Sequence, residues 1–383
     1  MLVGGAALSS NFVDKQIAKA YSGTVAYASD AMTGLELAKK IVDKDGFEAL
    51  KAELAARRAK LLAAAPAPAP APEAPAARSA TVPLLAELPT PTDFDRHVLR
   101  TTPIEQIWRF VNPLMLYGRH LGMKGGLVRK LGALTSVVGV PDARARAMLA
   151  ESEPKGLQIW DAVHEVMDDY KGTGILQPSA VYRYYRADSD GNRLRLYADG
   201  APEPAAIFEF PRQRRAEGLC LADYVRPREV TGARASDSVA FFVVSVGKGI
   251  RQLAEQLKNR GDYLKSHILQ ALALESAEAY AELLHSQLRK TWGFPDAPEM
   301  TMMERFQAKY RGKRYSFGYP ACPRLDDQGL LWKLLTPDEI GVQLTDGFMM
   351  DPESSVSALV FHHPDATYFS VGRTGEDDDD NRG

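Results

Sequence analysis

Hydrophobic and polar positions change between two periods along the chain, and each change marks an expected element. Residues 180–197 alternate with a period of two around Ser189-Asp190-Gly191-Asn192, which is the pattern of a β-hairpin with a tight turn. Short apolar runs between turn residues predict further strands. These runs are Ala205–Phe210, Val239–Val246, Gly341–Leu344, Ser355–Phe361 and Tyr368–Val371.

The same part of the chain contains two long stretches with helical spacing. Pro103–Tyr170 has apolar residues three or four positions apart, beginning with Ile107 and Phe110. Ile250–Trp292 is a second stretch, which we expect to break at Arg260-Gly261-Asp262. Strands and helices in this order predict an α+β domain.

The N-terminal residues follow another order, in which each strand precedes a helix. Met1–Gly5 and Thr24–Ala28 are the expected strands, and Phe12–Tyr21 and Leu35–Leu62 are the expected helices. A strand followed by Gly-Gly and a helix is half of an α/β unit. Because a parallel sheet needs more strands and cover on both faces, we interpret this piece as part of a larger domain.

Composition changes sharply at Ala63–Ala80, where alanine alternates with proline. Such a segment favours extended polyproline conformations without a packed core. It predicts an N-terminal piece of residues 1–62, a linker of residues 63–82 and a main domain of residues 83–372. The last residues, 373–383, contain EDDDD and form an expected acidic tail.

Charge and cysteine content exclude several classes of function. The 383 residues carry a formal net charge of −2, so no overall basic field indicates binding to nucleic acid or to an anionic membrane. The chain has no apolar run long enough to span a bilayer and no visible secretory signal. Cys220 and Cys322 lie far apart in sequence, so we expect no disulfide framework and a reduced cytoplasmic protein.

The segment Arg311–Pro323, RGKRYSFGYPACP, is the strongest candidate for a binding loop. Pro320 and Pro323 each remove a backbone donor, so regular helix or an inner strand is not expected there. Gly318 can adopt conformations that other residues adopt only at a cost. A rigid loop beside a guanidinium suits a zwitterionic small molecule, and a purely structural turn is the alternative.

Polar residues on one helix offer a second candidate. Glu278, Glu282 and His285 share a face of the predicted helix. Glu-x-x-His is the spacing of a di-metal helix, but a second copy is missing, so we predict no metal site. A solvated face with ion pairs and a polar wall of a ligand site remain the two alternatives. We expect His362 and His363 to lie in a turn or at the surface.

Five collinear segments resemble the C-terminal part of cobalamin-dependent methionine synthases. Their order along the chain is more specific than any segment alone. The segments are LVGGAALSSNFVDKQIAKAYSGTVAYASDAM, CLADYV, GDYLKSHILQALALESAEAYAELLH, RYSFGYPACP and TDGFMMDPESSVSALVFHHPDATYF.

The resemblance implies that residues 1–62 end a Rossmann-like cobalamin-binding domain. It implies that residues 83–372 are an activation domain, a curved antiparallel sheet flanked by helices, which binds S-adenosylmethionine. In this family cobalamin carries a methyl group to homocysteine and is occasionally oxidised to inactive cob(II)alamin. An electron from a flavodoxin-type donor and a methyl group from S-adenosylmethionine then restore methylcobalamin.

These expectations describe a methyltransferase of methionine biosynthesis that is incomplete in this chain. The alternative is a non-catalytic module that docks on a separate cobalamin-carrying subunit and a flavodoxin-type reductase. Zinc is expected only in the family's upstream modules. The family's upstream Asp-x-His-x-x-Gly motif, whose histidine ligates cobalt, does not occur here. We therefore expect a fragment, the product of a split gene or a deliberately shortened chain, with only a partial cobalamin site.

By motif, the resemblance assigns roles to three residues of the loop. Arg314 grips the carboxylate of the ligand, which a guanidinium can bind through two parallel hydrogen bonds. Ser316 takes a backbone-contact position. Tyr319 faces both ligand and corrin and is the catalytic candidate.

The resemblance also implies contacts outside the loop. Glu278 balances the ammonium or sulfonium charge of the ligand. Tyr368 and Phe369 are the aromatic pair that closes the pocket. The implied cobalamin contacts are Gly4, Gly5 and Ala31.

One departure from the family concerns the ligand's amino group. The family binds it with an aspartate near the first long helix, but here no acid lies between Glu105 and Asp142. Asn112 or Glu278 would have to replace that aspartate. A second departure is Arg324-Leu325, where the family has an acid and a histidine.

Overall fold

The computed structural model describes residues 1–4, 10–29, 31–63, 78–134, 138, 142–213, 218–231 and 235–371. The chain divides into two compact units, Met1–Glu73 and Ala74–Gly383. Residues 64–77 of the predicted linker and the predicted acidic tail lie outside the described residues. The assignment of functional domains to the predicted ranges therefore stays a prediction.

The first unit has the predicted order of strands and helices. Its two strands are parallel, with Leu2 opposite Ala26 and Gly4 opposite Ala28. The second predicted helix is divided at Asp43, whose carboxylate accepts a hydrogen bond from Gly46 N and begins a new helix. The elements are β1 (Leu2–Gly4), α1 (Ser10–Phe12), η1 (Val13–Ile17), α2 (Ala18–Ala20), β2 (Ala26–Ala28), α3 (Ala31–Val42) and α4 (Lys44–Ala63).

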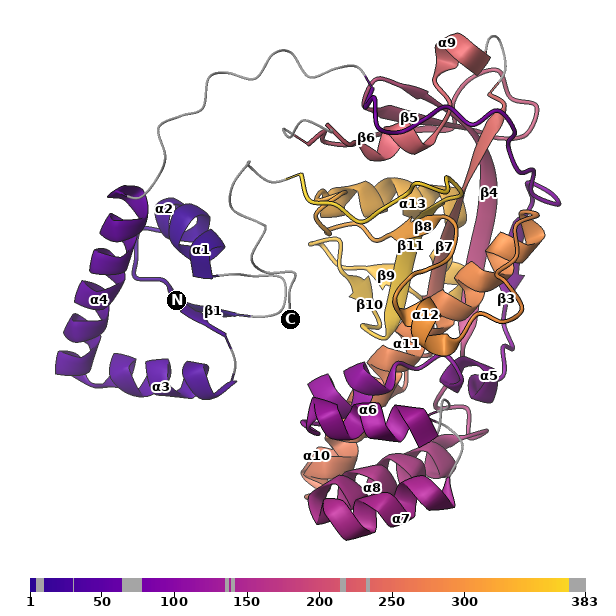
Figure 1. Ribbon diagram of the computed structural model, residues 1–383. Helices are drawn as coiled ribbons and strands as arrows, with labels where there is room; N and C mark the ends of the chain where they lie inside the picture. Colours follow the sequence, from indigo (N-terminus) through magenta and orange to yellow (C-terminus); the bar gives the residue numbers. More distant parts are fainter. Residues whose placement is uncertain are drawn as a thin grey trace. The chain divides into compact units, whose positions relative to one another are not determined.

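An antiparallel sheet forms the centre of the second unit (Figure 1). Its spatial order is β6-β5-β4-β7-β11-β8, and β3 pairs with β4 beside that path. The hairpin predicted around residues 189–192 is present as β4 and β5. The strands are β3 (Arg96–Leu99), β4 (Ser179–Asp190), β5 (Arg193–Tyr197), β6 (Ala206–Glu209), β7 (Asp237–Ser245), β8 (Lys313–Tyr315) and β11 (Ser355–Phe361). A separate two-stranded ribbon consists of β9 (Gln343–Leu344) and β10 (Met350–Asp351).

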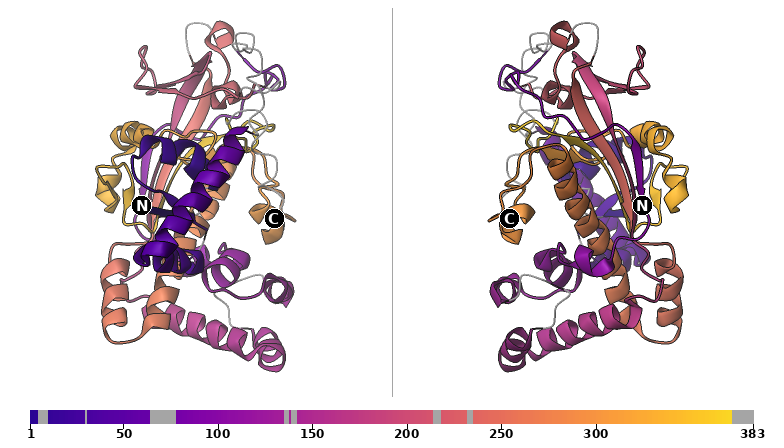
Figure 2. Two further views of the ribbon diagram at one scale, coloured as in Figure 1. Left: turned by 90° about the vertical axis from the view of Figure 1, so that its left-hand side faces the viewer. Right: turned by 90° about the vertical axis from the view of Figure 1, so that its right-hand side faces the viewer.

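Both faces of the sheet are buried, as the long apolar run of β7 requires. Phe242 and Val244 point into one hydrophobic core, and Phe241 and Val243 point into the other. The long helix α11 (Tyr263–Thr291) contacts β7 and β11, whereas α13 (Gln328–Leu335) contacts β4 and β7 (Figures 1 and 2).

Further helices extend the layer around α11. The predicted break at residues 260–262 separates α10 from α11. The long ones are α6 (Gly125–Leu134), α7 (Ala143–Ser152), α8 (Pro154–Tyr170) and α10 (Ile250–Asn259). Short helical segments are α5 (Ile104–Trp108), η2 (Leu114–His120), η3 (Leu221–Tyr224), α9 (Arg228–Thr231), α12 (Met302–Phe306), η4 (Leu325–Asp327) and η5 (Pro337–Ile340).

The α+β prediction with an antiparallel sheet flanked by helices is confirmed, but one local prediction is wrong and another is right only in part. Tyr368–Val371 forms no strand. His363 begins a turn, in which its carbonyl accepts a hydrogen bond from Ala366 N, but His362 and His363 are both buried and not at the surface. Asp237 Oδ1 lies 2.6 Å from Nε2 of the first, and Pro83 O lies 3.0 Å from Nε2 of the second. None of the helices in the described part of the chain has both the length and the apolar character needed to cross a bilayer.

Candidate functional site

The candidate loop begins as an edge strand. Arg314 in β8 lies opposite Val360 in β11, which agrees with the expectation that this segment forms no inner strand. Gly312 precedes it with φ +75°, and a Cβ there would lie 2.5 Å from Phe361 O. Gly318 follows with φ +87°. The chain can therefore turn into and out of β8 only with glycine or at a cost in strain.

The strand brings Arg314 onto a buried carboxylate of α11. Arg314 Nη1 donates to Glu282 Oε2 at 2.5 Å and to the Tyr310 hydroxyl at 3.2 Å. Tyr310 in turn donates to Glu282 Oε2 at 3.0 Å. Although burial opposes the charge, the carboxylate of Glu282 holds the pKa of Arg314 above its usual value.

A second arginine, Arg289, contacts both Tyr310 and Glu282. Arg289 lies with its guanidinium carbon 3.8 Å from the centre of the Tyr310 ring. Its Nε and Nη2 donate to the two carboxylate oxygens of Asp296, at 2.5 and 2.7 Å, and Arg305 pairs with the same carboxylate. Arg289 Nη2 is also 3.8 Å from Glu282 Oε1. Tyr310 and Glu282 are thus held in one orientation.

His285 completes the interior of this network without a charge of its own. The ring is fully buried and meets Tyr310 edge to face at 5.2 Å between ring centres. Burial, and then the nearby cations Arg289 and Arg314, keep its pKa well below the usual value. Glu282 and His285 therefore belong to a buried polar wall, whereas Glu278 on the same helix is exposed.

A cavity of 410 Å³ lies in front of this wall. Its lining is polar enough to hold a charged ligand, because acidic and basic side chains from different elements line it. Two of its lining residues have a buried polar atom without a hydrogen-bond partner among the described residues, Glu282 Oε1 and Ser355 Oγ. Its charged and aromatic lining includes Glu275, Glu278, Glu282, Tyr310, Arg314 and Tyr368.

The cavity unites three of the predicted site residues, Arg314, Glu278 and Tyr368. Two others lie elsewhere. Ser316 Oγ donates to Ser357 O at 2.9 Å, and Phe369 packs against the core on the other face of the sheet. The expected closing pair of Tyr368 and Phe369 is thus divided between a cavity wall and a core.

Tyr319 lies outside the lining residues of the cavity and is 64 % exposed. Partial burial and the charge of Glu278 raise the pKa of its hydroxyl. The hydroxyl therefore stays protonated at neutral pH and can donate a hydrogen bond.

The predicted cobalamin contacts lie in the first unit. A Cβ on Gly4 would lie 2.5 Å from Ala28 O, so pairing with β2 already requires glycine there. Ala31 begins α3, but its side chain lies outside the described residues, as does Gly5.

The other end of the cavity contains an acid that was not predicted from the sequence. Asn112, one of the two suggested substitutes, lines the cavity, but its Oδ1 already accepts a hydrogen bond from Leu114 N at 3.0 Å. Glu275 also lines the cavity and is only 5 % exposed, with Oε1 2.9 Å from His120 Nε2. Its position three residues before Glu278 is the signal that could have revealed it.

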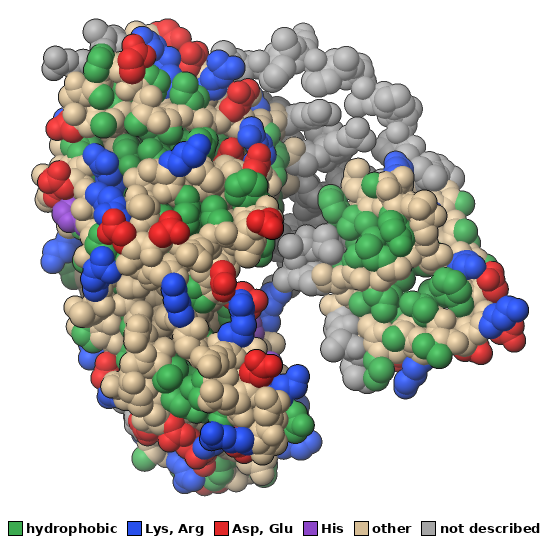
Figure 3. Space-filling model, turned by 180° about the vertical axis from the view of Figure 1, so that it is seen from behind, with side chains coloured by type: hydrophobic (Ala, Val, Ile, Leu, Met, Phe, Trp, Pro, Cys, Tyr) green, Lys and Arg blue, Asp and Glu red, His purple; other side chains and the backbone are tan. Residues whose placement is uncertain are grey.

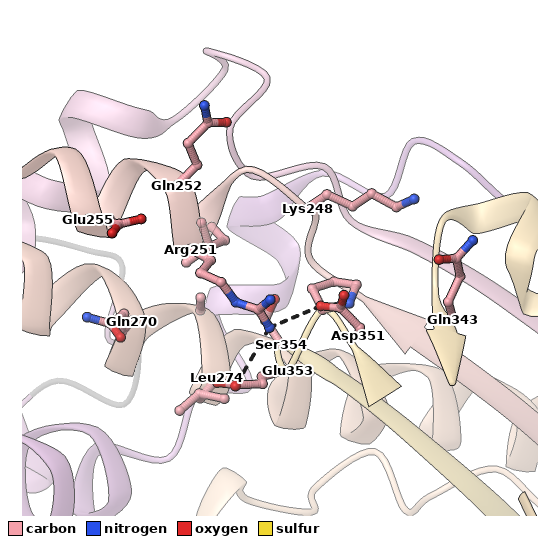
Figure 4. Close-up of a pocket in the computed structure, with 13 residues that line it drawn as sticks. Lys248, Arg251, Gln252, Glu255, Gln270, Leu274, Gln343, Asp351, Glu353 and Ser354 are labelled. Carbon is pink, nitrogen blue, oxygen red and sulfur yellow. Dashed lines mark hydrogen bonds and ion pairs between the residues drawn. The ribbon is translucent and has the colours of Figure 1, made fainter. Parts of the chain in front are cut away.

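A second cavity, of 370 Å³, adjoins the first and shares Leu274 and Glu353 with it. Figure 4 shows Arg251 reaching toward Asp351 and Glu353, at 3.1 and 3.7 Å. These side chains are largely exposed. Lys, Arg, Asp and Glu side chains are also interspersed over the face of the second unit shown in Figure 3.

Comparison with known proteins assigns the fold and the family. Residues 147–381 match the family described as vitamin B12 dependent methionine synthase, activation domain. Methionine synthase of Mycobacterium tuberculosis (strain ATCC 25618 / H37Rv) is 32% identical over 97% of this chain, and that of Mycobacterium leprae (strain TN) is 31% identical over 97%. The chain spans 32% of the length of each of these relatives.

A solved structure gives the same answer at the level of the fold. The crystal structure of the MetH reactivation domain bound to AdoHcy has a TM-score of 0.64 and 24% identity to this chain. The likeness covers 75% of this chain and 84% of that one. The chain therefore belongs to the vitamin B12-dependent methionine synthase family and contains its activation domain.

Proposed function

We propose that the second unit binds S-adenosylmethionine in the cavity at Arg314 and presents its methyl group for the reductive reactivation of cobalamin. The observation that carries this proposal is the fixed guanidinium of Arg314 at the wall of a cavity that also contains Glu278. The likeness in fold to a reactivation domain solved with AdoHcy supports it.

The charges behind the cavity suit one ligand carboxylate. Arg289, Lys313 and Arg314 contact Tyr310, and Arg305 pairs with Asp296. These four cations outnumber the two carboxylates in this network, Glu282 and Asp296. Among the described residues, no hydrogen bond joins Nε or Nη2 of Arg314 to the protein. Both donors can therefore bind a carboxylate while Nη1 stays on Glu282.

Other parts of the ligand would meet the remaining walls. Glu278 is exposed within the cavity and can balance a positive charge, and Tyr368 offers an aromatic face. Tyr319 lies near Glu278 and remains the candidate for contact with the corrin. These residues bind and orient, because the methyl group comes from the ligand and the electron from a reductase.

Cobalamin would be held largely by other modules of the enzyme, with only a few contacts from this chain. Gly4, Gly5 and Ala31 are its proposed contacts here. Gly4 by itself does not indicate a cofactor, because β2 already excludes a side chain there. When bound, cobalamin supplies the metal centre that accepts the methyl group. We place the protein in the cytoplasm, in keeping with its free, buried Cys220 and Cys322.

Calorimetric titration of the full chain with S-adenosylmethionine tests the proposal. We expect binding by the wild type and a loss of about tenfold to more than a hundredfold in Arg314→Ala, because a charged hydrogen-bonding partner is removed. Arg251→Ala, in the adjoining cavity, is the matched control and should bind as the wild type does. No binding by the wild type would contradict the proposed function and favour the non-catalytic docking module. An unchanged affinity in Arg314→Ala would contradict the site.

A further inference from the structure

The three glutamates of α11 divide the cavity into a cationic and an anionic end. Glu275, Glu278 and Glu282 all line it. With a rise of about 1.5 Å per residue, Glu278 lies roughly 6 Å and Glu275 roughly 10 Å from Glu282 along the helix axis. Glu282 is neutralised by Arg314. The uncompensated negative charge therefore lies toward Glu275.

Glu275 is a buried acid whose neighbour does not supply a full positive charge. Its only hydrogen-bond partner among the described residues is His120. Burial, and then His267 and Arg119, lower the pKa of His120, so the imidazole is neutral at neutral pH. An ionised carboxylate in such a place is costly without a counter-charge. A cationic centre on a ligand would provide one.

Two residues that line the cavity have a buried polar atom without a hydrogen-bond partner among the described residues. The atoms are Glu282 Oε1, which Arg289 Nη2 approaches only to 3.8 Å, and Ser355 Oγ. A buried polar atom without a hydrogen bond costs free energy. A polar molecule bound in the cavity would lie beside the side chains that carry these two atoms.

We propose that Glu275, oriented by His120, faces the sulfonium of S-adenosylmethionine and distinguishes it from the neutral thioether of S-adenosylhomocysteine. This inference rests on the proposed function. The α-carbon of the ligand carries both carboxylate and ammonium, so with the carboxylate on Arg314 the ammonium lies nearest Glu278. The sulfur lies three bonds farther along the ligand, in the direction of Glu275.

This assignment makes the binding of the two ligands differ in pH dependence. Burial, with a further contribution from Glu278 and against Arg119, raises the pKa of Glu275 to about 7. A sulfonium favours the ionised form, so its binding releases the proton. The affinity for S-adenosylmethionine should fall about tenfold per pH unit below that pKa, whereas S-adenosylhomocysteine should show no such slope.

The test is titration of the full chain with each ligand from about pH 5.5 to about pH 8. We expect Glu275→Gln to weaken S-adenosylmethionine by about tenfold or more at the upper pH and to remove the pH slope. The affinity for S-adenosylhomocysteine should stay within about twofold. Glu255→Gln, an exposed acid of the adjoining cavity, is the matched control and should change neither ligand.

Each other outcome is decisive. An equal loss for both ligands would assign Glu275 to the ammonium and overturn the sulfonium role, and no loss for either would overturn any role. Binding of neither ligand by the wild type would instead contradict the proposed function. If Glu275→Gln does not fold, the wild-type pH profiles still decide, because parallel profiles for the two ligands would overturn the inference.

Discussion

The cavity at Arg314 and the adjoining cavity at Arg251 both contain an arginine paired with carboxylates, yet the pairs differ in how they are held. Arg314 is 18% exposed and its partner Glu282 is 8% exposed, whereas Arg251 is 66% exposed. Water screens the exposed pair and leaves its side chains free to move, so such pairs contribute little. In the buried network the same residue types determine one geometry, because an unpaired charge there is costly.

The largest difference should appear when the buried carboxylate is removed. We expect Glu282→Ala to lower the free energy of unfolding of the second unit by about 3–5 kcal/mol, because Arg314 loses its counter-charge. Tryptophan fluorescence in urea measures this unit alone, since its tryptophans are Trp108, Trp160, Trp292 and Trp332 and the first unit has none. Glu255→Ala should change stability by less than about 0.5 kcal/mol. A loss below about 1 kcal/mol in Glu282→Ala would remove the contrast between the cavities.

A smaller effect should separate the arginines while keeping their charge. Arg289→Lys loses the two parallel bonds to Asp296 and the stacking on Tyr310, so we expect a cost of about 1.5–3 kcal/mol. Arg251→Lys should cost less than about 0.5 kcal/mol, because its exposed pairs need no fork geometry. The same urea unfolding measures both, and equal costs would show that geometry does not distinguish the two sites.

The smallest effect is the salt dependence of the exposed pair. Arg251→Ala should cost under about 0.5 kcal/mol at low salt and nothing measurable near 1 M salt. The cost of Glu282→Ala should persist at that salt concentration, because buried charges are screened much less. Unfolding at two salt concentrations measures this, and a salt-independent cost in Arg251→Ala would contradict the contrast.

Local sequence rules predict those parts of the fold that local interactions determine. The alternation of residues 180–197 predicts β4 and β5, and Arg260-Gly261-Asp262 predicts the end of α10, because turn chemistry decides both. The strand expected at Tyr368–Val371 is absent, since adjacent aromatics there serve a cavity and a core instead of a sheet. Burial of His362 depends on Asp237, a partner distant in sequence that no periodicity reveals.

The candidate site likewise depends on contacts between residues distant in sequence, which local patterns do not predict. Arg314, Glu278 and Tyr368 follow from the resemblance, and the cavity brings them together. That Arg314 is held by Glu282 could not be predicted, because the two residues lie on separate elements, β8 and α11, which only the folded sheet brings together. Glu275 could have been predicted, since it lies three residues before Glu278 on the same predicted helix.

Helix α11 runs unbroken from Tyr263 to Thr291. The intervals between Glu275, Glu278 and Glu282 are therefore set by backbone hydrogen bonds and not by the packing of side chains. The helix therefore fixes the positions along the cavity at which charges can be placed. Substitutions can change the charge at each position, but they cannot move a position by less than the rise of one residue.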